Sequence, residues 1–142
     1  MKVKLDAADI AFSKFIRERD EWTCQRCGTH DPDGPQRKGS HKVQCSHIFP
    51  RGNQSTRFYS INAKTLCFNC HNWFGSTPVE AARWVKDYLG SETLEELEKR
   101  ARQVWPRTKK EKKEIAKHWR AQTEYLIRCR EEGIEFHVSE WD

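Results

Sequence analysis

The sequence has no apolar run long enough to form a secretory signal peptide or a membrane-spanning helix. It has no internal repeat, and its one compositionally biased stretch is the basic run at 107–113. Hydrophobic residues account for only 36% of the 142 residues, against 33% for charged residues. These features argue against an integral membrane protein and predict a cytoplasmic one. Because a short, polar chain buries little apolar surface, they also predict a further stabilising element such as a bound metal ion.

Acidic residues are in the minority. The sequence contains 26 Lys and Arg residues and 21 Asp and Glu residues, which gives a formal net charge of +5 and a pI near 8.9. An excess of this size is compatible with a polyanionic partner such as nucleic acid, but it does not identify one. The positions of the basic residues therefore carry more information than their total.

The first half of the sequence alternates helix-like and strand-like patterns. Residues 5–19 have the spacing of an amphipathic helix that packs on a core. The stripe consists of Leu5, Ala8, Phe12, Phe15, Ile16 and Arg19. Residues 28–41, rich in Gly, Pro and Asp, predict an exposed loop. We expect short strands at 42–48 and 57–61, followed by a short helix that begins near Phe68. The sequence thus predicts an α+β fold.

The second half carries three helix-start signals of the form Thr-x-x-Glu, in which each side chain can cap the backbone of the other residue. They are Thr77 with Glu80, Thr93 with Glu96 and Thr108 with Glu111. We expect the three helices to end at Gly90, before Trp105 and at Gly133. This pattern divides the chain into a core with its N-terminal helix, residues 1–76, and a helical extension, residues 77–142, which packs on the core or projects from it.

Four cysteines form two Cys-x-x-Cys pairs, Cys24 with Cys27 and Cys67 with Cys70. This spacing lets both thiolates of a pair reach one tetrahedral ion, and two such pairs in a short chain are typical of a structural zinc site. A redox-active Cys-x-x-Cys needs only one pair. Four cysteine ligands leave no coordination position for water or substrate. We therefore expect Zn²⁺ to stabilise the fold and any chemistry to occur elsewhere.

A second set of residues, Ser46-His47, Asn62 and His71, lies between the cysteine pairs and directly after them. We expect His47 on a strand, Asn62 in a turn and His71 on a helix, all close to the same zinc ion. Hydrolysis of a phosphodiester needs a base to activate water, a cation to hold the phosphate oxygens, and fixed geometry. Histidine is the natural base near neutral pH, and a second histidine can ligate a divalent ion. The set therefore suits phosphodiester hydrolysis.

One spaced pattern of residues resembles the signature of the HNH endonucleases. It runs Cys24-x-x-Cys27 … Ser46-His47-Ile48-x-Pro50 … Asn62-x-x-x-Leu66-Cys67-x-x-Cys70-His71-Asn72. The resemblance implies a zinc-stabilised ββα-metal core of treble-clef type, here with an N-terminal helix and a C-terminal helical extension. Three shorter segments are similar to phage recombination nucleases of the lambda NinG type, which implies a role in phage DNA recombination or processing. These segments are Phe12-Ser-Lys-x-Ile16-Arg17-x-Arg19-Asp20, Cys45-Ser-His47 and Gly52-Asn-x-Ser55-Thr-Arg57.

The HNH resemblance implies roles for three residues. His47 would be the general base that activates water, and His71 would be a ligand of a catalytic Mg²⁺ or Mn²⁺. Asn62 would stabilise the turn that orients His47, although a purely structural capping role stays open. Many HNH proteins carry Asp or His directly before the base, where this sequence has Ser46. A hydroxyl is a poorer ligand for a hard cation than a carboxylate. Either Ser46 binds the ion weakly, directly or through water, or another group replaces it.

Basic residues surround the histidine that we expect to act as the base. Arg51 and Arg57 flank the turn after it, and Lys42 precedes it. The two guanidinium groups suit the binding of DNA phosphates, and the alternative is that they are solvated loop residues. Further basic residues either contact DNA or form a solvated face: Arg37, Lys38, Arg107, Lys109, Lys110, Lys112 and Lys113. No segment resembles a recognition helix. Weak sequence preference, or preference for nicked or branched DNA, is therefore expected.

Several other residues of chemically versatile types are expected to be structural. Cys45 and Cys129 suit small buried positions. Trp73, Phe74 and Trp84 are expected to pack the short helix on the helical extension rather than to stack on bases. The remaining histidines are expected at the surface or in packing contacts, and they are His30, His41, His118 and His137.

The sequence as a whole predicts a DNA endonuclease with a structural Zn²⁺ and a catalytic Mg²⁺ or Mn²⁺. Two alternatives stay open. The chain is either a zinc-stabilised DNA-binding module whose catalytic site is weak or inactive, or a zinc-stabilised protein-interaction domain whose basic residues are incidental.

Overall fold

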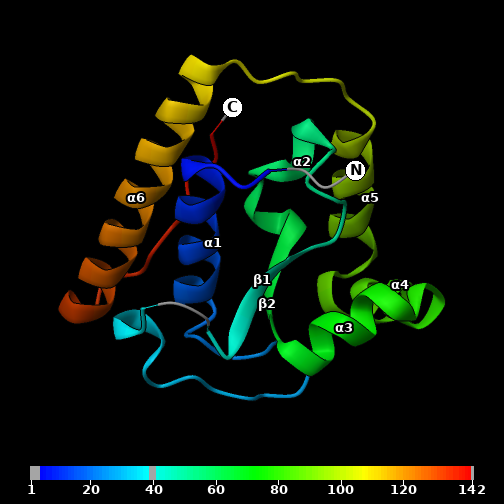
Figure 1. The fold of residues 1–142 in the computed structure, drawn as a ribbon, viewed down its shortest axis with the longest axis horizontal. Coiled ribbons are helices and arrows are strands. Elements are labelled where there is room, and N and C mark those ends of the chain that lie inside the picture. Colours follow the sequence, from blue (N-terminus) through cyan, green and yellow to red (C-terminus); the bar gives the residue numbers. More distant parts are fainter. Residues whose placement is uncertain (1–3, 39–40, 142) are drawn as a thin grey trace.

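The computed structural model describes residues 4–38 and 41–141 (Figure 1). Residues 39 and 40, within the expected loop at 28–41, lie outside the described residues. In chain order the elements are α1 (Ala7–Arg19), η1 (Gly34–Gln36), β1 (Val43–His47), α2 (Gln54–Arg57), η2 (Ser60–Asn62), β2 (Ala63–Cys67), α3 (Phe68–Ser76), α4 (Pro78–Leu89), α5 (Ser91–Ala101) and α6 (Lys109–Glu132). The expected α+β class is confirmed. Of the helices within the described ranges, none is both long and apolar enough to cross a membrane.

Helix α1 begins at a reciprocal cap between two aspartates. The Asp9 N–H donates to Asp6 Oδ1, and the Asp6 N–H donates to Asp9 Oδ2, both at 3.0 Å. Such a pair satisfies two backbone donors that the helix itself leaves free. The expected apolar stripe is buried at Ala8, Phe12, Phe15 and Ile16. Leu5 was wrongly placed on that stripe, because it precedes α1 and is 55% exposed.

The main apolar core lies between α1 and α6, which run side by side (Figure 1). The Trp119 ring lies 5.2 Å from Phe12 and 4.7 Å from Phe15, measured between ring centroids. The capping box predicted at Thr108 is formed, and α6 ends at Gly133, whose φ of 67° suits glycine. The last helix of the extension therefore packs directly on the first helix of the chain.

The two shorter helices of the extension depart from the predicted caps. Helix α4 does begin after Thr77 and end before Gly90. However, the Thr77 hydroxyl donates to the Trp73 carbonyl at 2.6 Å instead of capping the helix. Helix α5 begins two residues before Thr93, so the capping box predicted there is wrong. The reason is Gly90, whose φ of 84° reverses the chain at once and lets the next helix start immediately.

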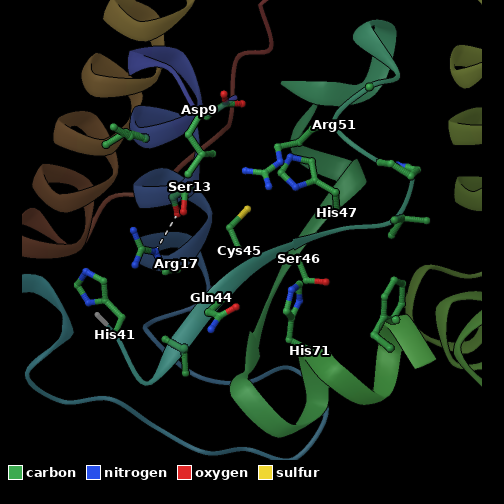
Figure 2. A pocket seen from close by; sticks show the side chains of 18 of the residues that line it. Asp9, Ser13, Arg17, His41, Gln44, Cys45, Ser46, His47, Arg51 and His71 are labelled. Atoms are coloured by element: carbon green, nitrogen blue, oxygen red, sulfur yellow. Dashed lines mark hydrogen bonds between the residues drawn. The ribbon is translucent and has the colours of Figure 1, made fainter. Parts of the chain in front are cut away.

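Strands β1 and β2 pair antiparallel and are followed by α3. Strand β1 matches the strand expected at 42–48, and it passes between α1 and α3 (Figure 2). The return strand expected at 57–61 is wrong, because the chain there leaves α2, turns through η2 and pairs only from Ala63 onward. Strand β2 reads AKTLC and is buried throughout, so its lysine and threonine hide it from a search for apolar alternation.

Arg57 ties α2 to α1 through a buried ion pair. Its side chain is 1% exposed, and its Nε and Nη2 donate to the two carboxylate oxygens of Asp9 at 2.9 and 2.5 Å. This corrects the expectation that Arg57 contacts DNA phosphates, because its guanidinium is already occupied inside the protein. A buried pair of this kind is costly to break, since either partner alone is left as an uncompensated charge.

We therefore predict that Arg57→Met lowers the free energy of unfolding by about 3–5 kcal/mol, because it leaves the Asp9 carboxylate buried without its partner. Urea denaturation followed by circular dichroism measures this change. The control is Arg51→Met, which removes an arginine that is only partly buried. The double variant Asp9→Asn/Arg57→Met should be more stable than Arg57→Met alone. Equal losses in Arg57→Met and Arg51→Met would contradict the role of the ion pair.

Candidate functional site

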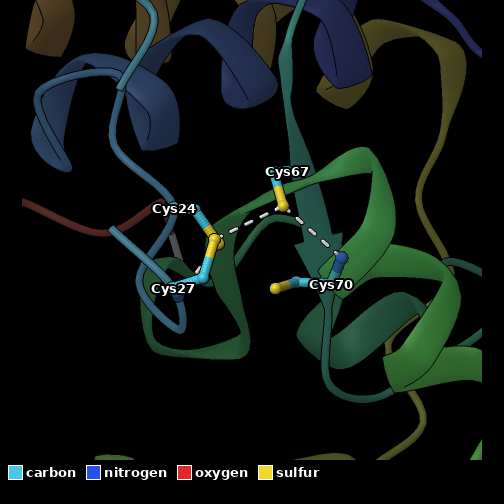
Figure 3. Close-up of side chains that lie close together, drawn as sticks. All are labelled: Cys24, Cys27, Cys67 and Cys70. Atoms are coloured by element: carbon cyan, nitrogen blue, oxygen red, sulfur yellow. Dashed lines mark hydrogen bonds between the residues drawn. The ribbon is translucent and has the colours of Figure 1, made fainter. Parts of the chain in front are cut away.

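The four paired cysteines converge on one point of the molecule. The sulfur atoms of Cys24, Cys27, Cys67 and Cys70 all lie within 4.8 Å of one another (Figure 3). Cys27 Sγ and Cys67 Sγ are 3.6 Å apart. A tetrahedral zinc ion with Zn–S bonds of about 2.3 Å places its ligand sulfurs about 3.8 Å apart. The cluster therefore fits a structural metal ion such as Zn²⁺.

Each pair of thiols is placed by local backbone structure. After α1 the chain forms a tight knuckle, in which the Cys24 N–H donates to the Thr29 carbonyl at 2.8 Å and the Gly28 N–H donates to the Cys24 carbonyl at 2.9 Å. The second pair spans the junction of β2 and α3, where Cys67 is the N-cap residue of the helix. The Cys70 N–H points at Cys67 Sγ, 3.5 Å away. A knuckle and a strand-to-helix junction thus supply two thiols each.

The electrostatics of the cluster favour a bound cation. A hydrogen bond with Thr29 lowers the pKa of the Cys27 thiol to about 6, whereas burial raises the pKa of the Cys70 thiol to about 12. A divalent cation is needed to hold four thiolates this close together. Arg26 lies beside the cluster, where its Nη1 donates to Cys70 Sγ at 3.5 Å. Its guanidinium also stacks 3.6 Å from the centroid of the Trp73 ring. Because four thiolates around one Zn²⁺ carry a net negative charge, this arginine offsets part of it.

The residues expected to be structural take packing positions. Cys129 is buried on α6, and Cys45 is partly buried on β1; neither belongs to the cysteine cluster. The Trp84 ring meets both Trp73 and Phe74 edge to face at 6.5 Å. These contacts confirm the expected packing of α3 on the extension, specifically on α4.

A cleft of about 1240 Å³ runs along β1 between α1 and α3 (Figure 2). His47 from β1 and His71 from α3 both line it, together with Ser46 and Arg51. His71 directly follows Cys70 in the sequence, so the cysteine cluster fixes the backbone that carries this histidine. The structure therefore brings the two histidines to one cavity, although they are far apart in the sequence.

The His47 imidazole is held in a single orientation by the backbone. Its Nε2 lies 3.1 Å from the carbonyl oxygen of Arg57. A carbonyl can only accept, so Nε2 carries the proton and Nδ1 keeps its lone pair. The ring also lies 5.8 Å from the Phe12 ring. Burial lowers the pKa of His47 to about 4, and the imidazole is therefore neutral at physiological pH and able to accept a proton.

Asn62 holds the turn directly after His47. Its Oδ1 accepts from the Phe49 N–H at 2.8 Å, and its Nδ2 donates to the Phe49 carbonyl at 3.0 Å. The Asn62 carbonyl also accepts from the Ile48 N–H at 2.7 Å. The side chain is completely buried and uses both ends of its amide for this turn. Asn62 therefore acts on the cleft by positioning the backbone that leaves β1.

Three buried polar atoms beside this turn have no hydrogen-bond partner within the described ranges: Ser46 Oγ, Lys64 Nζ and His71 Nδ1. Ser46 and Lys64 lie directly opposite each other in the strand pair. Burial lowers the pKa of the Lys64 ammonium to about 7. Sequence reasoning missed Lys64. The sequence offered no signal for it, because β2 lacks the apolar alternation of a half-buried strand.

The cleft is electropositive because its arginines outnumber its carboxylates. Arg17 of α1 and Arg51 both line the cleft, and sequence analysis did not single out Arg17 as a basic candidate. Of the described residues that line the cleft, Asp9 alone carries a carboxylate, and that group is paired with Arg57. A cleft with this balance of charge attracts an anion.

The other basic candidates lie outside the cleft. Lys42 and Lys38 are exposed and are not among the residues that line it. Arg37 is paired with Asp31 at 3.0 Å. The basic run at 107–113 also lies elsewhere, and there Arg107 pairs with Glu111 at 3.7 Å and Lys112 with Asp6 at 3.4 Å. In each pair the acidic partner neutralises part of the local positive charge.

The donors of the cleft fit a hard divalent cation poorly. Mg²⁺ and Mn²⁺ prefer carboxylate oxygens, and the Asp9 carboxylate is occupied by Arg57. At the positions where the HNH resemblance implies metal ligands, the donors are a neutral hydroxyl on Ser46 and a ring nitrogen of His71. The Lys64 ammonium lies across the strand pair from Ser46, where its positive charge opposes a second cation.

No known protein family, curated protein or solved structure matches this chain. Its function has to be argued from the chemistry of the cluster and the cleft.

We predict that the purified protein contains one zinc ion per chain and that Cys24→Ser loses both zinc and cooperative folding. The physical reason is that structural zinc contributes on the order of 10 kcal/mol to the folding of small modules. Elemental analysis and thermal denaturation measure the two effects. The matched control is Cys129→Ser, which changes a buried cysteine outside the cluster and should retain zinc. Equal zinc contents in the two variants would refute the site.

We also predict that the His47 ring protonates near pH 4 rather than near its ordinary pKa of 6.5, because burial disfavours the charged imidazolium. A proton NMR titration of the ring resonances measures this. Unfolded chains bind this proton at higher pH than folded ones, so the free energy of unfolding should fall as the pH drops from 6.5 toward 4. His47→Gln should lose that part of the pH dependence. A ring that titrates at its ordinary value would contradict the prediction.

Proposed function

We propose that the protein is an endonuclease that hydrolyses phosphodiester bonds of DNA in the cleft lined by His47 and His71. The observation that carries this proposal is the state of His47, which is neutral, oriented by a backbone carbonyl and placed in an electropositive cleft. A general base has to be unprotonated and held in a fixed orientation, and His47 meets both conditions. The order of the two strands, the following helix and the cysteine cluster supports the same proposal through the resemblance to HNH endonucleases.

In the proposed reaction, His47 Nδ1 accepts a proton from water while the water oxygen attacks the phosphorus atom. The phosphorus–oxygen bond on the opposite side breaks, the departing oxygen takes up a proton from solvent, and His47 then releases its proton to solvent. The resemblance implies a 5′-phosphate and a 3′-hydroxyl as the products. Asn62 holds the backbone that carries the base, and Arg51 is placed to bind a neighbouring phosphate with its guanidinium.

The resemblance also implies a catalytic Mg²⁺ or Mn²⁺, with His71 and Ser46 as its ligands. Because these donors fit a hard cation poorly, no step of the proposed reaction depends on such an ion, and the cleavage assay tests the metal requirement. Contacts to phosphates carry little sequence information. We therefore propose weak sequence preference, with nicked or branched DNA as preferred substrates. The similarity to lambda NinG favours a role in phage DNA recombination or processing, in the host cytoplasm.

A second candidate function is DNA binding without cleavage. It is favoured by Ser46, which replaces a carboxylate or imidazole ligand, and by the occupied state of Asp9. Under this alternative the cleft still binds phosphates but provides too little stabilisation of the transition state. The first candidate function requires His47 for cleavage of DNA, whereas in the second candidate function His47 has no catalytic role.

We predict that the protein nicks supercoiled plasmid DNA and that His47→Ala lowers the nicking rate by about 10²–10⁴-fold, the usual contribution of a general base. Gel electrophoresis of timed reactions measures the rate, and DNA affinity should change little. The matched control is His137→Ala, which removes an exposed histidine outside the cleft. Linear, nicked, flap and four-way junction DNA should be compared, each with Mg²⁺, with Mn²⁺ and with a chelator. DNA binding without nicking, unchanged in His47→Ala, would favour the second candidate.

A further inference from the structure

Lys64 carries a buried amine that has no acidic partner among the described residues. Its side chain is 0% exposed, and its Nζ has no hydrogen-bond partner in the part of the chain that the structure describes. The nearest groups to compensate the charge are aromatic faces, with the Phe74 ring 3.3 Å and the Trp84 ring 6.0 Å from Nζ. Aromatic rings offset only part of the cost of burying a charge. An unpaired charge in this position therefore requires a functional explanation.

Two further polar atoms without partners lie next to this charge. Ser46 faces Lys64 across the strand pair, and residues paired in this way have Cβ atoms about 4.5–5.5 Å apart. His71 is one helical turn from Phe74, whose ring contacts the ammonium. Unlike Lys64, both Ser46 and His71 line the cleft, and Figure 2 shows the His71 ring directed toward Ser46. The cleft floor thus carries two hydrogen-bonding groups with a buried lysine behind them, and a bound anion would favour the charged form of that lysine.

We propose that Ser46, Lys64 and His71 form an anion site that holds a non-bridging phosphate oxygen of a nucleic-acid strand. The site takes the role that a divalent cation would otherwise have, and this proposal rests on the proposed nuclease function. The Ser46 hydroxyl and a ring N–H of His71 donate to the phosphate oxygen. Lys64 does not touch the phosphate and acts through its charge, which is effective because burial screens it little from the cleft floor.

Charge balance favours an anion over a cation at this position. A cation here would meet the Lys64 ammonium across the sheet and would find no free carboxylate, since Asp9 is paired with Arg57. A phosphate oxygen would instead compensate the buried charge and give partners to Ser46 and His71. The charge and the hydrogen-bonding groups of these three residues therefore suit an anion and do not suit a cation.

The first test measures binding of a short fluorescent single-stranded oligodeoxynucleotide by anisotropy, in the presence of a chelator too weak to remove the structural zinc. We expect Lys64→Met to weaken binding by about tenfold, because it removes a positive charge that is little screened from the phosphate. The matched control is Lys86→Met, which removes the same formal charge from an exposed position on α4. It should change the affinity by less than about twofold.

The second test converts the site instead of disabling it. Ser46→Asp places a carboxylate opposite Lys64, so it should weaken oligonucleotide binding and create a site for Mn²⁺ beside His71. Paramagnetic broadening of the His71 ring resonances by Mn²⁺ reports this change. We expect broadening at a much lower Mn²⁺ concentration in Ser46→Asp than in the unmodified protein. Zinc content and the denaturation midpoint verify the fold of each variant, and Ser46→Asp alone decides the question if Lys64→Met fails to fold.

The outcomes separate the anion site from the proposed nuclease function. Equal affinities in Lys64→Met and Lys86→Met would overturn the anion site, as would Mn²⁺ broadening of His71 in the unmodified protein at the concentration that affects Ser46→Asp. Plasmid nicking that needs Mn²⁺ or Mg²⁺ and is unchanged by Lys64→Met would keep the nuclease and reject the anion site. Oligonucleotide binding that depends on Lys64, without any nicking, would keep the anion site and reject the nuclease.

Discussion

The convergence of four thiols is the contact on which the rest of the molecule depends. It joins the knuckle that follows α1 to the junction of β2 and α3, segments that are separated by about forty positions in the chain. The residues of β1 and α3 that line the cleft lie between the two cysteine pairs or shortly after the second pair. Because the chain has few apolar residues, hydrophobic burial alone would stabilise such a loop only slightly. A bound metal ion would supply the missing stabilisation.

A second constraint connects α1 with the candidate base. The Arg57 side chain is paired with Asp9 in α1, while the Arg57 carbonyl accepts from the His47 ring. One residue therefore stabilises the fold with its side chain and orients the imidazole with its backbone. Asp9 takes part in the helix cap, the ion pair and the wall of the cleft. Stability and geometry of the cleft are consequently coupled through these two residues.

The sequence predicted the features that depend on local spacing. The Cys-x-x-Cys pairs, strand β1, the start of α3 and the capping box of α6 all belong to this group. It did not predict β2, because a buried lysine and threonine interrupt the apolar pattern. Nor did it distinguish the buried Arg57 from the partly exposed Arg51, since both lie in the same polar segment. Which arginine meets a carboxylate is decided by contacts between distant segments, and spacing along the chain does not encode those contacts.

The direct succession of Cys70 and His71 has a consequence for the life of the protein in the cell. The helix turn that carries His71 is anchored by a cysteine of the cluster, so a chain that has not yet acquired its metal lacks a formed cleft floor. Binding of a metal ion by the cluster would then come before the cleft takes its final shape. Newly synthesised chains would complete their folding only once a metal ion is available.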